Sequence, residues 1–122
     1  EQVDKTFLNR NFSSGEGNLY KNMGNSELLW EGNTSDAYKF NLELKTNTER
    51  DDYSDLAHLI DVLNNYVGLD LICELELIMN VDALIRVMAL DVIMGHWDGP
   101  FLNKNNFYLQ DVNVRASYKF FL

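Results

Sequence analysis

The stretch that decides the fold is residues 80–99, which read NVDALIRVMALDVIMGHWDG. Asn80 can cap a helix that runs from Val81 to about Gly95, because asparagine is favoured just before a helix and glycine just after it. The apolar side chains of this helix surround its axis almost completely, which is typical of a helix at the centre of a domain. The stretch therefore predicts a buried helix followed by a polar loop that starts at His96.

The rest of the chain predicts short strands and further helices around this central helix. Residues 38–45 alternate between aromatic or leucine side chains and polar ones, which favours a half-buried strand. Residues 56–63 place their apolar side chains on one face of a helix. The expected elements are a helix over Val3–Phe12, strands over Leu19–Lys21 and Tyr38–Lys45, helices over Asp52–Asn65 and Leu69–Met79, and strands over Phe107–Leu109 and Tyr118–Leu122 with a turn near Asp111–Asn113.

The composition excludes several classes of protein. The 122 residues allow one domain at most, and 10 basic against 19 acidic residues give a formal net charge of -9. Modules that bind nucleic acid are usually basic, because neutralising phosphates drives that binding, so nucleic acid is not an expected partner. We expect no membrane span, and no signal peptide is visible at the start. The single Cys73 lies among Leu and Ile residues, which favours a buried thiol.

The densest group of polar residues follows the predicted buried helix and comprises His96, Asp98, Asn103, Asn105 and Asn106. The spacing His96-x-Asp98-x4-Asn103 matches the catalytic loop of protein kinases, in which the Asp accepts the proton of the attacking hydroxyl and the Asn holds magnesium. A long helix before the loop and a hairpin after it are also typical of kinases. The alternative is an Asx-rich turn whose side chains bond to local backbone. A third interpretation is a metal or ion site without phosphoryl chemistry.

Residues 80–99 resemble the CotH kinase family (spore coat protein H and its relatives), and so do residues 104–109, KNNFYL. Residues 1–12, 17–21, 44–45 and 55–63 are similar to the family as well, so the resemblance covers nearly the whole chain. It implies an α+β fold, namely the mainly helical C-lobe-like portion of an atypical protein-kinase-like fold with short strands and a C-terminal β-hairpin. It also implies that ATP and Mg²⁺ or Mn²⁺ are used to phosphorylate a protein substrate at the spore coat, at the cell surface or outside the cell.

The resemblance assigns roles to individual residues of the loop. Asp98 would be the catalytic carboxylate. Asn103 has the usual kinase spacing for the metal ligand, whereas Asn106 immediately precedes the strand and matches the family's Asn-aromatic-Tyr pattern, which favours Asn106. His96 is expected to brace the loop by a hydrogen bond to backbone, and Trp97 to pack the loop onto the helices. No residue is assigned to bind the nucleotide itself.

The resemblance further implies that residues 1–122 are the middle of a single CotH kinase-like domain. The first lobe is expected before Glu1, and an Asp-x-Asp metal motif after Leu122. Because Mg²⁺ prefers about six oxygen ligands, these residues alone are expected to be inactive in transfer of radiolabel from ATP. The alternative function is a non-catalytic structural or assembly module of a spore coat or cell-surface system, with Tyr38, Tyr53 and Tyr66 as exposed contact residues.

Overall fold

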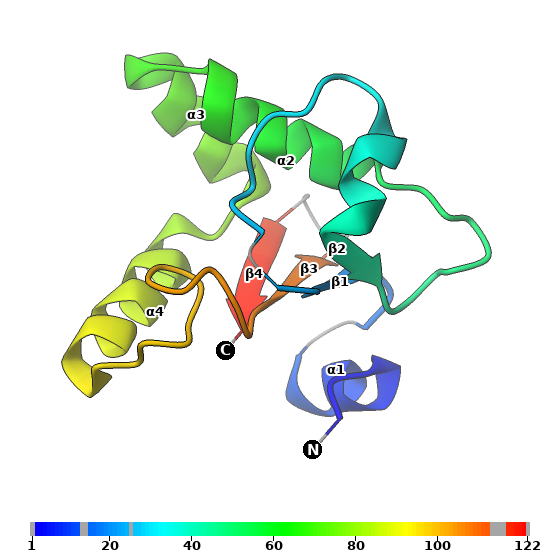
Figure 1. The fold of residues 1–122 in the computed structure, drawn as a ribbon, viewed down its shortest axis with the longest axis horizontal. Helices are drawn as coiled ribbons and strands as arrows, with labels where there is room; N and C mark the ends of the chain where they lie inside the picture. The colour runs from blue at the N-terminus through cyan, green and yellow to red at the C-terminus, as the bar shows by residue number, and fades with distance from the viewer. Residues whose placement is uncertain (1, 13–14, 25, 113–116, 122) are drawn as a thin grey trace.

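The structure is a computed structural model that describes residues 2–12, 15–24, 26–112 and 117–121. It confirms the α+β class, with helices packed around one small antiparallel sheet (Figure 1). The elements are α1 (Lys5–Asn11), β1 (Leu19–Asn22), the 3₁₀ helix η1 (Ser35–Phe40), β2 (Leu42–Leu44), α2 (Ser54–Asn65), α3 (Gly68–Ile78), α4 (Val81–Met94), β3 (Tyr108–Val112) and β4 (Ser117–Phe121).

The sheet has the strand order β2-β1-β3-β4, and every neighbouring pair is antiparallel. Tyr20 of β1 lies opposite Leu44 of β2 and Leu109 of β3, so the N-terminal and C-terminal parts of the chain share one sheet. The predicted C-terminal hairpin is confirmed as β3 and β4. The predicted turn is placed too early, because Asp111 still belongs to β3; Asn113 and Leu122 lie outside the described residues.

The core lies between the sheet and α2. Leu56, Leu59 and Ile60 of α2 are fully buried, as their helical spacing predicts. They belong to one apolar cluster with Tyr20 and Leu109 of the sheet. Burial of each such side chain contributes about 1.5–3 kcal/mol, so α2 is the helix that holds the sheet in place.

The strand predicted over Tyr38–Lys45 is only partly correct. Its first half forms η1, and only Leu42–Leu44 is extended as β2. Tyr38 is buried and Phe40 is 94% exposed, so these two residues do not share a face as alternation requires. The hydroxyl of Tyr38 donates to the carbonyl of Gly32 at 2.8 Å, which holds η1 against the preceding loop.

The prediction of a buried central helix is wrong, although the bounds of the helix are right. Asn80 caps α4 by accepting a hydrogen bond from the Ala83 N–H at 3.0 Å, and Gly95 ends the helix in the left-handed conformation. However, Asp91 is the only residue of α4 that is buried, and Ile93 is 78% exposed. The helix packs against β4 along one side and leaves its other apolar side chains at the surface.

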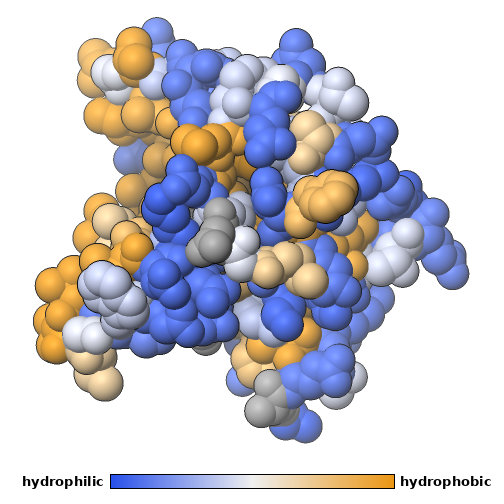
Figure 2. Space-filling model, viewed as in Figure 1, coloured by the Kyte–Doolittle hydropathy of each residue, from blue (hydrophilic) through white to orange (hydrophobic). Residues whose placement is uncertain are grey.

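The same exposure extends to α3, so Cys73 is also exposed rather than buried. Figure 2 shows the hydrophobic side chains gathered along the edge of the molecule that α3 and α4 form. The apolar residues of this surface that are more than half exposed are Leu69, Ile72, Leu77, Ile85, Leu90, Val92, Ile93 and Met94. Among the described residues, no helix is both long and apolar enough to cross a membrane.

Candidate active site

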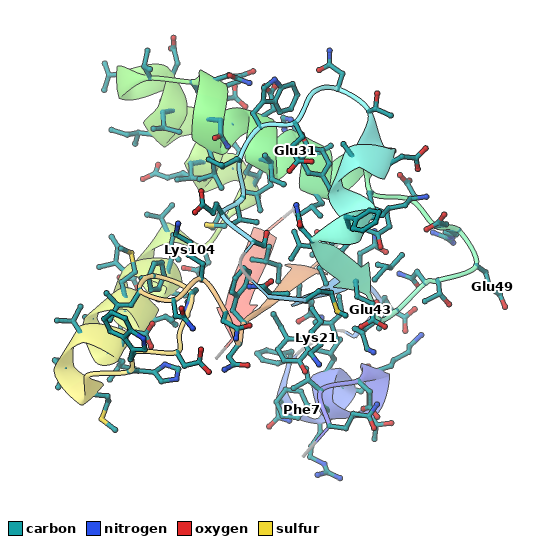
Figure 3. The ribbon with its side chains drawn as sticks, in the orientation of Figure 1. Phe7, Lys21, Glu31, Glu43, Glu49 and Lys104 are labelled. Carbon is teal, nitrogen blue, oxygen red and sulfur yellow. The ribbon has the colours of Figure 1, made fainter. Side chains whose placement is uncertain are left out.

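The loop with the kinase-like spacing connects α4 to β3. It is anchored to the sheet at its far end, where the Asn22 side chain of β1 donates to the Lys104 carbonyl at 2.6 Å and the Asn22 N–H donates to the Phe107 carbonyl at 3.1 Å. Lys104, which lies beside α4 in Figure 3, also forms an ion pair with Glu27. Phe107 is buried. Residue 106 therefore lies next to a residue bonded to β1, although β3 begins at Tyr108, one residue later than the sequence predicts.

Asp98 is half-buried, and its carboxylate accepts hydrogen bonds from three asparagine amides of the same loop. Asn103 Nδ2 lies 2.7 Å and Asn105 Nδ2 3.3 Å from Asp98 Oδ1, and Asn106 Nδ2 donates to Asp98 Oδ2. Donors on both oxygens fix the orientation of the carboxylate. The structure thus brings Asp98, Asn103 and Asn106 together, and it adds Asn105.

The backbone around these amides takes an uncommon conformation. Lys104 and Asn106 have φ of 54° and 50°, in the left-handed region that side chains other than glycine and asparagine seldom adopt. Such residues persist only where the surrounding structure holds them, and they are frequent at functional sites. Here the bonds from Asn22 and to Asp98 hold them, so the loop is rigid where the amides converge.

The other end of the loop rests on Asp91, which sequence reasoning did not identify. His96 Nδ1 lies 2.9 Å from Asp91 Oδ1, and the His96 N–H donates to the Asp91 carbonyl at 3.0 Å. The ring of His96 therefore contacts a carboxylate where we expected a bond to backbone, and the backbone bond is made by the His96 N–H instead. Asp91 is 2% exposed, and its Oδ2 has no hydrogen-bond partner among the described residues. The signal in the sequence was a single acidic residue within the apolar stretch that precedes His96.

The contact between Asp91 and His96 requires a glycine at position 99. A Cβ atom at Gly99 would lie 2.6 Å from Asp91 Oδ2 and 2.8 Å from His96 Nδ1, closer than real Cβ atoms approach. Only a glycine lets the backbone after Asp98 pass over the buried carboxylate. The position of Asp98 is therefore set by Gly99 and Asp91 as well as by the asparagine amides.

The prediction that Trp97 packs the loop onto the helices is wrong. Trp97 is 70% exposed, and it lines an open pocket of about 510 Å³ with His96, Asp98 and the end of α4, including Leu90 and Met94. The indole stays exposed because the apolar side chains at the end of α4 are themselves exposed. They form no buried surface against which the indole could pack. The pocket places an apolar wall directly beside the Asp98 carboxylate.

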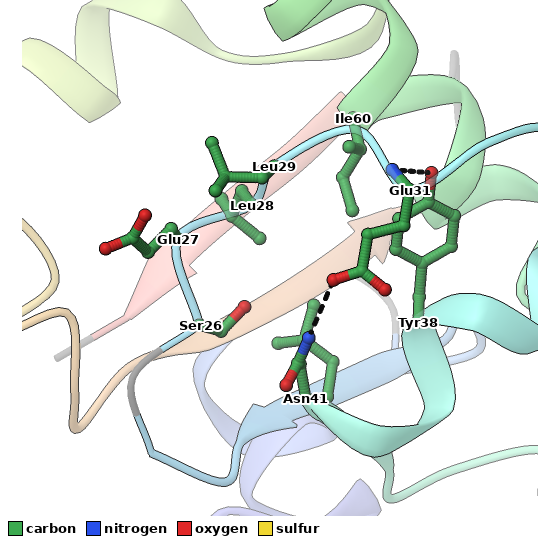
Figure 4. Close-up of a pocket in the computed structure, with 9 residues that line it drawn as sticks. Ser26, Glu27, Leu28, Leu29, Glu31, Tyr38, Asn41 and Ile60 are labelled. Atoms are coloured by element: carbon green, nitrogen blue, oxygen red, sulfur yellow. Dashed lines mark hydrogen bonds between the residues drawn. The ribbon is translucent and has the colours of Figure 1, made fainter.

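A second, smaller cavity of about 140 Å³ lies between residues 26–31, η1 and α2 (Figure 4). Asn41 Nδ2 donates to the Glu31 carboxylate at 3.2 Å, and the Glu31 N–H donates to the Tyr38 hydroxyl at 3.3 Å. The polar groups around this cavity therefore bond to one another. It is a packing feature beside the core rather than a candidate reaction site.

Comparisons with known proteins agree with the resemblance seen in the sequence. A family model described as CotH kinase protein matches residues 1–121, essentially the whole chain. Neither the comparison with curated proteins nor the comparison with solved structures gives a match.

Proposed function

The chain belongs to the CotH kinase family, and from this membership together with the arrangement around Asp98 we propose that the protein is an atypical protein kinase. It transfers the γ-phosphoryl group of ATP to a Ser or Thr hydroxyl of a coat or surface protein, at the spore coat, at the cell surface or outside the cell. The observation that supports this proposal is the oriented, half-exposed carboxylate of Asp98 at a rigid loop between a helix and a strand.

In the proposed reaction the substrate hydroxyl oxygen forms a bond to the γ-phosphorus, the bond to the bridging oxygen breaks, and ADP leaves. Asp98 holds the hydroxyl in line and takes its proton. Positioning and charge account for most catalysis of phosphoryl transfer, so a carboxylate fixed by three amides suits this role. The contacts of Asp91 with His96 and Gly99 position the loop without touching the substrate.

The asparagines fit a role as metal ligands only in part. Asn103 and Asn106 use their Nδ2 groups to bind Asp98, which leaves their Oδ1 atoms for a hard cation. In the described residues no group of three or more His, Cys, Asp or Glu side chains is placed to hold a metal. Mg²⁺ or Mn²⁺ would therefore take one or two amide oxygens here, with phosphate, water and other groups as the remaining ligands, and would screen the charge of the phosphates.

The test is transfer of radiolabel from γ-labelled ATP to protein substrate by the full-length protein and its Asp98→Ala variant. We expect the variant to lose 10²–10⁴-fold in rate, the range typical of general acid–base groups, while its far-ultraviolet circular dichroism is unchanged. Asp82→Ala is the matched control, because Asp82 is exposed on α4 and, within the described residues, forms an ion pair with Arg86 at 2.9 Å. Equal rates in the wild type and the Asp98 variant contradict the proposal.

A second candidate function is the non-catalytic assembly module. Tyr38 and Tyr53 do not support it, because they are 2% and 4% exposed and cannot contact a partner, whereas Tyr66 is half-buried. The observation that favours it is the exposed apolar surface of α3 and α4. The two functions differ in their response to nucleotide: ATP with Mg²⁺ at 100 times its Kd stabilises a kinase by about 2.7 kcal/mol and leaves an assembly module unchanged.

A further inference from the structure

The open pocket of about 510 Å³ beside Asp98 is lined mainly by apolar side chains. Leu90 and Met94 belong to the last two turns of α4, and Trp97 follows at the start of the loop. All three are more than half exposed, so their apolar surface is open to a ligand. An apolar cavity of about 150 Å³ is large enough for benzene, so this pocket has room for one leucine or aromatic side chain of a partner.

The pocket is continuous with the proposed reaction site, because Asp98 itself lines it. The amides of Asn103 and Asn106 hold that carboxylate in place, so its position beside the pocket is fixed before a ligand binds. An extended peptide advances about 3.3 Å per residue. A peptide whose Ser or Thr hydroxyl reaches Asp98 therefore brings the side chain one or two residues away to the pocket.

The charges around the pocket exclude the phosphates of the nucleotide. Asp91 and Asp98 are the acidic residues of its lining, and no Lys or Arg of the described residues lines it. Phosphate groups are held by basic side chains, whereas carboxylates repel them. An acidic side chain of a protein substrate would be repelled in the same way.

A basic side chain finds no free acidic partner in the pocket either. Asp91 is 2% exposed, its Oδ1 lies 2.9 Å from His96 Nδ1, and the backbone of Gly99 passes close to its Oδ2. Asp98 is the remaining acid of the lining, and its oxygens already accept from three amides and receive the substrate hydroxyl in the proposed reaction. What the pocket offers an incoming side chain is therefore its apolar surface.

The loop presents Trp97 in a defined position. The N–H of the preceding residue, His96, donates to the Asp91 carbonyl at 3.0 Å, and Gly95 ends α4 in the left-handed conformation. A rigid aromatic side chain loses little conformational freedom when a ligand packs against it, and tryptophan is accordingly frequent at binding hot spots. Met94, which lines the same pocket, can adapt its shape to different apolar partners.

We propose that this pocket binds a leucine-like or aromatic side chain within two residues of the acceptor Ser or Thr, and so selects the protein substrate. The inference rests on the proposed function, because Asp98 must be the place where the acceptor hydroxyl binds. Trp97 and Met94 contact the neighbouring side chain and take no part in the transfer itself. Their replacement therefore raises the KM for the substrate and leaves the KM for ATP unchanged.

The experiment uses the full-length protein, γ-labelled ATP and synthetic peptides that differ at one position within two residues of a central Ser. The varied residue is Phe, Leu, Ala, Asp or Lys. We expect Phe or Leu to give a kcat/KM at least about 10-fold above that of Ala, and Asp and Lys to give no gain. Trp97→Ala and Met94→Ala should abolish this preference. Ile93→Ala is the matched control and should keep it, because Ile93 is exposed on α4 and does not line the pocket.

Peptide binding gives a readout that does not need phosphoryl transfer. Fluorescence anisotropy of a labelled peptide in which Ala replaces the Ser, titrated with the full-length protein, measures its Kd. The peptide with Phe at the varied position should bind at least about 10-fold more tightly than the one with Ala, and Trp97→Ala should remove the difference. Because Trp97 and Met94 are exposed, we expect both variants to fold, which circular dichroism checks.

The outcomes separate this inference from the proposed function. Transfer to peptides without a preference for an apolar neighbour, or with a preference for Asp or Lys, overturns the assignment of the pocket and leaves the kinase proposal standing. A preference that survives in both Trp97→Ala and Met94→Ala places the apolar subsite elsewhere. Absence of transfer to any substrate refutes the proposed function, and the anisotropy then decides whether the pocket binds an apolar peptide. Self-association of the full-length protein that Trp97→Ala abolishes assigns the pocket to a second copy and also overturns the inference.

Discussion

Replacing Asp111 by Asn should stabilise the protein at neutral pH. The carboxyl of Asp111 has its pKa raised from 3.8 to about 6, by burial first and by Asp55 second. The folded state therefore binds the proton more tightly than the unfolded state. Its contribution to stability is fully present below about pH 4 and is lost as the pH rises through about 6. Asparagine has nearly the same shape and carries no charge, so it removes this loss.

The size of the effect follows from the two pKa values. One unit of pKa corresponds to 1.36 kcal/mol, so ionised Asp111 reduces the free energy of unfolding by up to about 3 kcal/mol at pH 7.5 and by roughly half as much at pH 5. The neighbouring acid Asp52 has a lowered pKa, which acts in the opposite direction and only below about pH 4. Between pH 5 and 7.5 the advantage of Asp111→Asn should therefore grow with pH.

Urea unfolding of both proteins, followed by circular dichroism at pH 5.0, 6.0 and 7.5, measures this difference. Asp70→Asn serves as the control for loss of one exposed acid and should follow the wild type. Parallel pH profiles for the wild type and Asp111→Asn, or an asparagine variant that is less stable at pH 7.5, would refute the reasoning.

Four further substitutions test the packing. Leu59→Ala should cost about 2–5 kcal/mol and Ile93→Ala less than about 0.5 kcal/mol in urea unfolding, because Leu59 is fully buried and Ile93 is 78% exposed; similar costs would mean that α4 is buried after all. Gly17→Ala should prevent stable folding, since its Cβ would overlap a carbonyl of β3, and a cooperative unfolding transition like that of the wild type would contradict this. Gly99→Ala should cost about 1–3 kcal/mol by crowding Asp91 and should slow phosphoryl transfer, with rate and stability measured on the same sample; an unaltered rate would argue against a positioning role.

Local signals in the sequence predicted the ends of elements well. The cap at Asn80 and the left-handed end of α4 at Gly95 depend on residues within one helical turn, so the pattern alone identifies them. The exposure of α4 could not be predicted from its own sequence. Apolar side chains on every side of a helix show that the helix is able to be buried, but they do not show whether other elements of the domain cover it. Cys73 was misjudged for the same reason.

The loop of Asp98 was predictable because its spacing is local, and the structure brings its asparagines to one carboxylate. The contact of Asp91 with Gly99 was not predicted, since it depends on how the loop turns back over the helix. The electrostatic effect of Asp55 on Asp111 depends on the register of β1 against β3 and on where α2 begins. No spacing in the sequence reports such a contact between distant segments.

In the proposed function Asp98 acts in the transfer step rather than in holding the loop or the nucleotide. Single-turnover transfer and ATP-dependent thermal stabilisation, measured side by side on the full-length wild type and Asp98→Asn, separate these roles. We expect Asp98→Asn to keep its stabilisation by ATP with Mg²⁺ and to transfer phosphate at least about 100-fold more slowly. A variant that transfers phosphate at the wild-type rate would contradict it.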